Sequence, residues 1–239
     1  METIVVAAAT AGEISLLVKM TNAKEALSRG LTDLHEWECG SKRVILAVTG
    51  VGKANTAALL AILIDRFSPG RLINIGCAGA YNGSRLAVGA LAIATAEIYG
   101  DEGVLTPLGW RPLDCIGIPL LKVQGKGYFN EIPLSSSLVE RAIGFAAAGA
   151  IPLLSGKFVT VSTCSGTAER GRELSGRFCA ICENMEGAAA AHVALMHGVE
   201  FMEIRGISNM VEDRDLSRWD IATAAENAQR FIHAFIGAL

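Results

Sequence analysis

Charged residues are scarce in this sequence of 239 residues: they make up 19% of the chain, and the formal net charge is only −3. A protein without a surplus of basic residues has no general attraction for the phosphate backbone of a nucleic acid or for an anionic membrane surface. We therefore expect no nucleic-acid partner and no membrane partner, and any nucleotide chemistry should concern a small molecule.

Long apolar runs and targeting signals are also missing. The longest apolar run, Ala57–Ile64, is much shorter than a bilayer span and is followed directly by Asp65 and Arg66. The first three residues lead straight into a strand-like run, without the basic segment and cleavage pattern of a signal peptide. We expect a cytoplasmic protein without a membrane-spanning segment.

The cysteines do not form a metal-binding pattern. There are six, and only Cys179 and Cys182 stand close together. No second cysteine pair and no neighbouring histidine pair completes the ligands of a zinc site. We interpret the cysteines as reduced thiols, as in a cytosolic protein, and the close pair Cys179 and Cys182 as buried small apolar residues. Nothing in the sequence predicts a metal or an organic cofactor.

The sequence does contain a large apolar fraction, 51%, together with 26 glycines, which favours close packing of helices on a sheet. Short runs rich in valine and isoleucine predict strands that begin at Ile4, Arg43, Arg71, Leu91, Lys157 and Phe201. Apolar spacing predicts helices over Lys53–Phe67, Ser136–Ala150, Ala168–Leu174, Gly187–His197 and Ile221–Phe235. This alternation predicts one α/β domain over residues 1–239, with a central mixed, mostly parallel, twisted sheet flanked by helices.

The stretch from Gly100 to Pro133 differs from the rest, because it holds four of the six prolines and has little periodicity. We interpret it as a long irregular excursion, and such loops in compact domains are usually functional or interfacial.

Ligands of open α/β sheets bind beyond the carboxyl ends of the strands. This rule directs attention to six loops: Thr10–Glu13, Gly50–Lys53, Gly76–Tyr81, Ser162–Gly166, Glu183–Gly187 and Ser208–Asp213.

The glycine-rich segment TGVGKANTA is not a phosphate-binding P-loop. That motif needs glycine where Ala47 stands and serine or threonine where Ala54 stands. We interpret the segment as a strand-to-helix turn with Lys53 in solvent. Gly76 and Gly79 would let backbone amides approach a ligand, although a tight structural turn explains them equally well.

Three polar side chains are the main candidates for chemistry. Glu13 either compensates a helix dipole or activates water. Glu186, next to Met185, either compensates a helix dipole or, as a buried carboxylate that needs a partner, binds a ribose diol. Asn209 either forms a turn or uses its donor and acceptor at a ligand. The loop Ser162–Gly166 either caps the next helix or lines the same site.

Five motifs follow one another along the chain: an apolar strand ending near Glu13, then TGVGKANTA, NIGCAGA, NMEGAA and RGISN. In this order and spacing they resemble the purine nucleoside phosphorylase and methylthioadenosine/S-adenosylhomocysteine nucleosidase superfamily, over nearly the whole chain. The resemblance implies an enzyme that cleaves the N-glycosidic bond of a purine nucleoside. Of the acidic cluster that nucleosidases usually carry in the first loop, only Glu13 is present.

Water is the expected nucleophile. Phosphorylases of this superfamily commonly hold phosphate with an arginine in the first loop, whereas this loop has Glu13 and no arginine. A carboxylate beside the anomeric carbon repels phosphate but can orient and deprotonate water.

The last motif narrows the resemblance to one branch. Nucleosidases that act on adenine substrates typically read ISD where this chain reads Ile207-Ser208-Asn209. The ISN form followed by VEDRD…W, with TVSTCSGTAE and IGIPLL…YFNEIPL, is similar to the futalosine hydrolases of the alternative menaquinone pathway, which act on a hypoxanthine nucleoside. A 6-oxopurine presents N7 and O6 acceptors on one edge, and the Asn209 amide can donate there without being an acid.

The resemblance implies roles for ten residues. Asn209 stabilises the leaving purine, and Glu13 activates the attacking water. Glu186 holds the 2′- and 3′-hydroxyls of the ribose, and Met185 packs against the sugar. The other substrate-binding candidates are Cys77, Ala78 and Gly79 around the ribose and water, and Ser162, Thr163 and Cys164 around the base.

The carboxylated aromatic arm of such a substrate should extend toward the excursion, where Lys126 and Arg111 are basic candidates. A neighbouring subunit is a further candidate to complete the site, because members of the superfamily form dimers or larger assemblies and we expect a homo-oligomer here. Two other functions stay open. One is a nucleosidase for methylthioadenosine, S-adenosylhomocysteine or aminodeoxyfutalosine, and the other is a non-catalytic nucleoside-binding domain of the same fold.

Overall fold

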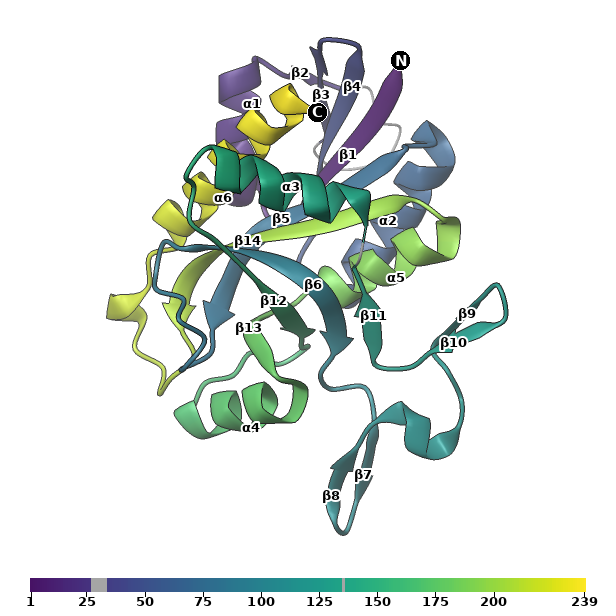
Figure 1. Cartoon of the computed structure of the whole chain (residues 1–239), viewed down its shortest axis with the longest axis vertical. Helices are drawn as coiled ribbons and strands as arrows, with labels where there is room; N and C mark the ends of the chain where they lie inside the picture. The colour runs from purple at the N-terminus through teal and green to yellow at the C-terminus, as the bar shows by residue number, and fades with distance from the viewer. Residues whose placement is uncertain (27–33, 135) are drawn as a thin grey trace.

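The computed structural model describes residues 1–26, 34–134 and 136–239, and its main feature is a mixed sheet with helices on both sides (Figure 1). The strands of this sheet are β1 (Glu2–Ala8), β2 (Lys24–Glu25), β3 (Leu34–Cys39), β4 (Lys42–Val48), β5 (Arg71–Ala80), β6 (Leu91–Tyr99), β11 (Glu131–Pro133), β12 (Leu153–Thr160), β13 (Ala180–Asn184) and β14 (Glu200–Met210). The helices are η1 (Ala11–Glu13), α1 (Ser15–Thr21), α2 (Lys53–Phe67), α3 (Ser137–Ala148), α4 (Ala168–Phe178), α5 (Gly187–His197), η3 (Leu216–Arg218) and α6 (Ile221–Ala238).

Five strands of the sheet close into a ring. β5 pairs with β14, β14 with β6, β6 with β12, β12 with β13, and β13 again with β5. β1 and β4 continue the sheet from β5 in parallel, and valine, isoleucine and alanine side chains of these strands are fully buried. The prediction of a mixed α/β sheet flanked by helices is confirmed, and the ring places the ends of β5, β13 and β14 side by side.

The longer predicted elements are found where the sequence placed them. The expected helices Lys53–Phe67 and Gly187–His197 coincide with α2 and α5. The Ser136 side chain caps α3 by accepting from the amide of Val139, whereas the adjacent Ser135 lies outside the described residues. The prediction missed α1, β3 and β13, which are short and show no clear period.

The stretch from Gly100 to Pro133 is more ordered than expected. It forms two small hairpins and a single turn, which are β7 (Val104–Thr106), β8 (Gly109–Arg111), η2 (Leu113–Ile116), β9 (Leu121–Val123) and β10 (Lys126–Tyr128). β11 then joins the main sheet beside β6. Strands of three residues are too short to show the alternation that identifies a strand in a sequence. In Figure 1 both hairpins project away from the sheet. We call residues 100–133 the excursion.

The prediction that Cys179 and Cys182 are both buried is wrong for one of them. Cys182 is buried in β13, but Cys179 is exposed because it ends α4 in a left-handed conformation at the surface. Cys115 and Cys164 are also exposed. No helix in the described ranges is long and apolar enough to cross a membrane.

The last helix holds the first loop in place. The buried Gln229 of α6 accepts hydrogen bonds from the amides of Leu16 and Leu17, at 2.8 and 3.1 Å, through its Oε1. Its Nε2 donates to the carbonyl of Gly12 at 3.3 Å. These three bonds, which we call the Gln229 clasp, join the end of the chain to the loop that carries Glu13.

Candidate active site

A cavity of about 200 Å³ lies at the carboxyl ends of β1, β5, β13 and β14. Eight of the ten predicted site residues line it: Glu13, Cys77, Ala78, Gly79, Cys164, Met185, Glu186 and Asn209. The other lining residues are Ala9, Thr10, Val51, Ser165, Glu183, Asn184, Ser208 and Trp219. Segments from both ends of the chain therefore meet at one site.

Ser162 and Thr163, predicted around the base, do not line this cavity. The amide of Ser162 donates to Asp101 Oδ2 at 2.6 Å, which holds the start of the loop toward the excursion. The chain reaches the cavity only at Cys164 and Ser165.

Glu13 is buried at the bottom of the first loop and is fixed by both carboxylate oxygens. Oε2 accepts from the amide and the hydroxyl of Thr10, at 3.0 and 2.9 Å, as a residue at the start of a helix does. Oε1 accepts from the amide of Cys77 on β5, at 2.8 Å. The Glu13 side chain thus caps the start of η1 and also lines the cavity.

Glu186 stands immediately before α5 and is held from two sides. Its Oε1 accepts from the amide of Gly52 at 3.0 Å, and its Oε2 lies 3.3 Å from Nη1 of Arg205. Arg205 is itself buried, and its Nη1 also donates to the carbonyl of Cys77 at 3.2 Å. A Cβ on Gly76 would lie 2.5 Å from that Nη1 and 2.7 Å from Glu13 Oε1. Arg205 therefore sits between the two candidate carboxylates.

Asn209 and Glu183 flank Gly79 in neighbouring strands. Gly79 pairs with Asn209 of β14 on one side and with Glu183 of β13 on the other. The register of β14 shifts between Ile207 and Asn209, an irregularity of the kind that redirects a side chain beside a site. One hydrogen of the Asn209 amide bonds to the carbonyl of Met210 at 3.0 Å, and among the described residues none takes the second.

Glu183 is held by the loop in front of it. Its Oε1 accepts from the amide of Ser165 at 2.7 Å, and its Oε2 accepts from the Ser165 hydroxyl at 2.6 Å and from the Tyr81 hydroxyl at 3.1 Å. The carboxylate is thus fixed at the same end of the cavity as Asn209 and keeps accepting capacity toward it.

Cys77 is not a nucleophile in this arrangement. Burial, reinforced by the neighbouring charge of Glu13, raises the pKa of the Cys77 thiol to about 12. The thiol is therefore neutral at physiological pH and serves as a small wall of the cavity. On the other side, Cys164 Sγ lies 3.3 Å from the sulfur of Met185.

Lys53, expected in solvent, is half-buried and paired. Its Nζ lies 2.6 Å from Asp101 Oδ1 and 2.9 Å from Glu102 Oε1. Burial alone would lower the pKa of Lys53, but the hydrogen bonds to Asp101 and Glu102 outweigh it and raise the pKa. The sequence could not show this pairing because the partners lie about fifty residues further along the chain.

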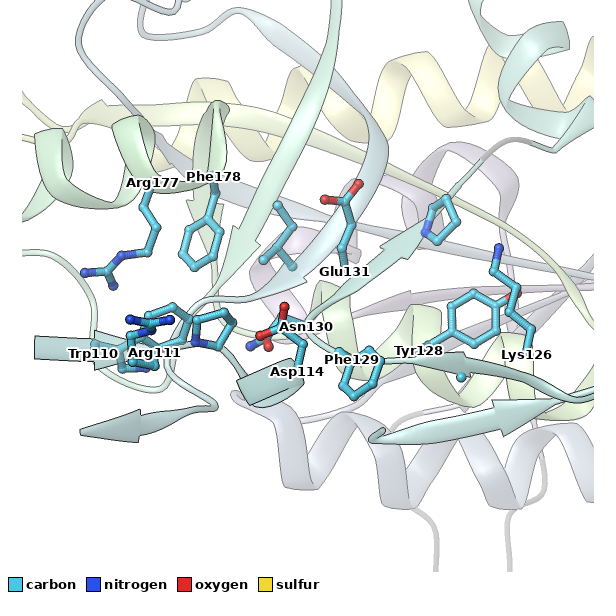
Figure 2. A pocket seen from close by; sticks show the side chains of 14 residues that line it. Trp110, Arg111, Asp114, Lys126, Tyr128, Phe129, Asn130, Glu131, Arg177 and Phe178 are labelled. Atoms are coloured by element: carbon cyan, nitrogen blue, oxygen red, sulfur yellow. The ribbon is translucent and has the colours of Figure 1, made fainter. Parts of the chain in front are cut away.

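A second cavity, of about 610 Å³, lies under the excursion (Figure 2). Trp110, Arg111 and Arg177 gather at one end of it, and Lys126 and Tyr128 at the other. The two cavities share no lining residue. Within one chain, Lys126 and Arg111 are therefore separate from Glu13, Glu186 and Asn209, and the prediction that they bind a substrate arm has no support from this arrangement.

Glu183, Arg205 and Trp219 lie at or behind the first cavity and were not among the predicted site residues. Glu183 lies in a short strand without a local pattern, whereas Arg205 is the first residue of the RGISN motif. Trp219 is the tryptophan of the VEDRD…W segment, which belongs to the resemblance to futalosine hydrolases. In the structure its ring is stacked by Arg214, with 4.8 Å between the guanidinium and the ring centre.

Comparison with known proteins agrees with this fold. The profile of the Phosphorylase superfamily matches residues 3–237. A futalosine hydrolase of Thermus thermophilus is 33% identical over 189 residues, which cover 79% of this chain and 79% of the relative. A 5′-methylthioadenosine/S-adenosylhomocysteine nucleosidase of Halalkalibacterium halodurans is 29% identical, over 83% of this chain and 82% of the relative.

A solved structure with the same fold is a 5′-methylthioadenosine/S-adenosylhomocysteine nucleosidase from Neisseria meningitidis in complex with methylthio-immucillin-A. It superposes with a TM-score of 0.85 at 26% identity and covers 100% of both chains. The family profile spans nearly all of the sequence, and the relatives named here are hydrolases or nucleosidases. The chain therefore belongs to the Phosphorylase superfamily.

Proposed function

We propose that this chain is an N-glycosyl hydrolase that cleaves futalosine with water, giving hypoxanthine and dehypoxanthine futalosine. The observation that carries the proposal is the convergence of Glu13, Glu186 and Asn209 on one cavity, with Glu183 beside Asn209. Glu13 activates water, Glu186 binds the ribose diol, and Asn209 stabilises the leaving base.

Water fits this cavity better than phosphate does. Of the residues described as lining it, none is a lysine or an arginine, and three are glutamates. Arg205, the buried cation behind it, is already paired with carboxylates. A phosphate ion would face uncompensated negative charge, whereas a water molecule can donate to Glu13 and be deprotonated by it.

The same charges favour the transition state of glycosidic cleavage. The departing base leaves positive charge on the ribosyl group, as in glycosyl transfer generally. Glu13 and Glu186 are held in place before the reaction by backbone amides, so that no reorganisation is needed as that positive charge develops.

The base end of the cavity favours a 6-oxopurine. The free hydrogen of the Asn209 amide can donate to N7 or O6, which are acceptors on one edge of hypoxanthine. Hypoxanthine also carries a hydrogen on N1, which a carboxylate such as Glu183 accepts, whereas adenine has a lone pair at N1. The Asn209 amide is thus a donor on one side of Gly79, and the Glu183 carboxylate is a fixed acceptor on the other side. Together they support selection of hypoxanthine over adenine.

The second candidate function is a nucleosidase for adenine nucleosides such as methylthioadenosine. The relative from Halalkalibacterium halodurans favours it, because that protein is named for such substrates. Asn209 counts against it, because an amide cannot deliver a proton to the N7 of a leaving adenine.

A panel of nucleosides tests the proposal. Purified protein is incubated with futalosine, aminodeoxyfutalosine, inosine and methylthioadenosine, with and without phosphate, and the free base is followed. We expect hypoxanthine from futalosine at a rate that does not depend on phosphate. Release of adenine alone would establish the second candidate, and a requirement for phosphate would refute hydrolysis.

The same panel with Asn209→Asp tests the base selectivity. Aspartate can protonate N7 of adenine but, when ionised, repels the O6 edge of hypoxanthine. The variant should lose activity on futalosine and gain relative activity on aminodeoxyfutalosine, while Asn55→Asp on the exposed side of α2 should change neither. An unchanged preference would remove Asn209 from the selectivity argument.

A further inference from the structure

Arg205 needs a counter-charge that Glu186 alone does not supply. Its guanidinium is buried and stays ionised at any physiological pH, so it requires close carboxylates. The shortest of its contacts runs from Nε to Oε1 of Glu203 on the same strand, at 2.6 Å, whereas Glu186 Oε2 is 3.3 Å from Nη1. Glu203 is therefore the main anchor of Arg205.

The second oxygen of Glu203 faces another carboxyl group. Glu203 Oε2 is buried and has no hydrogen-bond partner among the described side chains and backbone groups other than this carboxyl. A Cβ on Gly187 would overlap both Glu203 Oε2 and Oε1 of Glu97, so the two oxygens converge on the same point at the start of α5. Both glutamates are fully buried.

Two carboxyl groups this close in a fully buried site cannot both be ionised. Burial and the charge of Glu203 raise the pKa of Glu97 well above its ordinary value, although a hydrogen bond from Thr160 acts in the opposite direction. Glu97 is then a carboxylic acid at neutral pH. Its proton, on Oε1, bonds to Glu203 Oε2 and satisfies the oxygen that otherwise lacks a partner.

Glu97 also reaches the active site by a second route. Its Oε1 accepts from Nδ2 of Asn184 at 2.8 Å. The Oδ1 of Asn184 accepts from the amides of Glu186 and Gly187, at 2.9 and 2.7 Å. One route thus runs from Glu203 through Arg205 to Glu186, and the other from Glu97 through Asn184 to the backbone of Glu186.

We propose that Glu97 and Glu203 act as one unit with a single negative charge, and that this unit positions Arg205 and Glu186 for cleavage of the glycosidic bond. Neither residue lines the cavity, so both are positioning residues. The inference rests on the proposed function, because it assigns the pair to the same reaction. Glycine at position 187 is required, since any side chain there would separate the two carboxyl groups.

Single substitutions should exchange the roles of the two residues. In Glu97→Gln the amide nitrogen can still donate to Glu203, although it can no longer accept from Nδ2 of Asn184, so activity should fall by at most about 10-fold. In Glu203→Gln the negative charge must move to Glu97, which is buried and more remote from Arg205. Activity should then fall by about 10- to 100-fold at pH 6 and recover as the pH rises.

The double variant Glu97→Gln/Glu203→Gln should lack this recovery, and at high pH it should lose far more activity than the product of the two single losses. The other titratable groups facing the pair are Arg205 from β14, Cys182 from β13, Tyr99 from β6 and Glu186 from α5, and all remain in these variants. If activity falls at low pH in the same way in Glu203→Gln as in wild type, the proposal is overturned. If the double variant fails to fold, the pH dependence of activity in Glu97→Gln and in Glu203→Gln still tests the proposal.

Infrared spectroscopy tests the shared proton without any substrate. Wild-type protein at pH 7 should show the carbonyl band of a buried, protonated carboxyl group. The band should vanish in Glu97→Gln and persist in Glu140→Gln, an exposed control on α3. Absence of the band from wild type would refute the pair even if futalosine is cleaved, whereas its presence would support the pair even if another nucleoside is the substrate.

Discussion

Three carboxylates line the candidate active site, and each is immobilised by different neighbours. Backbone amides from Thr10 and Cys77 hold Glu13, the amide of Gly52 and Arg205 hold Glu186, and two hydroxyls and an amide hold Glu183. Each keeps lone pairs for a ligand. Groups fixed in this way do not have to be ordered when substrate binds, which lowers the barrier to reaction.

Replacing Glu13 by glutamine tests the base at the residue scale. Glutamine keeps the shape and can still accept from Cys77, but it cannot take a proton from water. We expect kcat to fall by about 100-fold or more, with little change in the affinity for substrate. Steady-state kinetics and binding of a non-hydrolysed nucleoside analogue measure the two effects.

The matched control is Glu140→Gln, which changes an exposed carboxylate far from the cavity and should leave kcat as it is. Near-normal turnover in Glu13→Gln would show that another group activates the water.

At this scale the sequence was informative where a residue lies in a motif. Glu13, Glu186 and Asn209 follow predicted strands within recognisable segments, and all three line the cavity. Arg205 lies in the RGISN motif within β14, and Glu183 lies within β13, but neither position shows which side chains the residue pairs with. Their importance depends on pairings between strands that are far apart in the sequence, and those pairings have no local signature.

The start of α2 is the element that links the excursion to the active site. Lys53 bonds to Asp101 and Glu102, Asp101 accepts from the amide of Ser162, and the preceding residue, Gly52, donates to Glu186. The start of α2, the start of the excursion and the loop that begins at Ser162 therefore meet at the half-buried Lys53 and its carboxylate partners.

Substituting Asp101 by asparagine should weaken this junction. Burial alone would raise the pKa of Asp101, but hydrogen bonds from Lys53 and Ser162 outweigh it and lower the pKa. A carboxyl group with a lowered pKa stabilises the fold above its ordinary pKa, near 4, and this stabilisation is lost as the pH falls through the lowered value. The variant should lose about 1 kcal/mol of unfolding free energy between pH 5 and 9.

The difference from wild type should begin to shrink below about pH 4 and disappear below the lowered pKa of Asp101, and urea unfolding at several pH values measures it. Asp65→Asn, an exposed change on the same helix, should have no such effect. A loss that is equal at pH 3 and pH 7 would show that the ionised pair is not its source.

Helices of eleven residues or more and strands of seven residues or more were predictable, and shorter elements were not. α2 and α5 show several helical repeats, so their bounds could be stated in advance. β13 has five residues and the hairpin strands have three, too few for any period. The closed ring also could not be predicted, because it depends on which strands pair and not on where they lie in the sequence.

The molecule as a whole has an uneven surface. On the excursion, Leu105 is 84% exposed, Leu108 92% and Ile118 66%, and Figure 1 shows this segment projecting from the sheet. Large apolar side chains exposed on a projecting segment favour association with another protein. We propose that this partner is a second copy of the chain, as in the expected homo-oligomer.

Sedimentation velocity tests this expectation. Wild-type protein should sediment as a dimer or larger at micromolar concentration, because association removes these side chains from water. Leu105→Asp/Leu108→Asp should shift it toward monomer, whereas Ile143→Asp on α3 should not. A wild-type protein that is monomeric at these concentrations would contradict the expectation.

The Gln229 clasp has a consequence for biosynthesis. During translation the loop bearing Glu13 leaves the ribosome early, but the side chain that fixes Gly12, Leu16 and Leu17 follows more than two hundred residues later. The nascent chain therefore cannot complete the contacts that hold the loop of Glu13 until α6 has emerged and docked. A chain interrupted before α6 would lack all three bonds of the clasp.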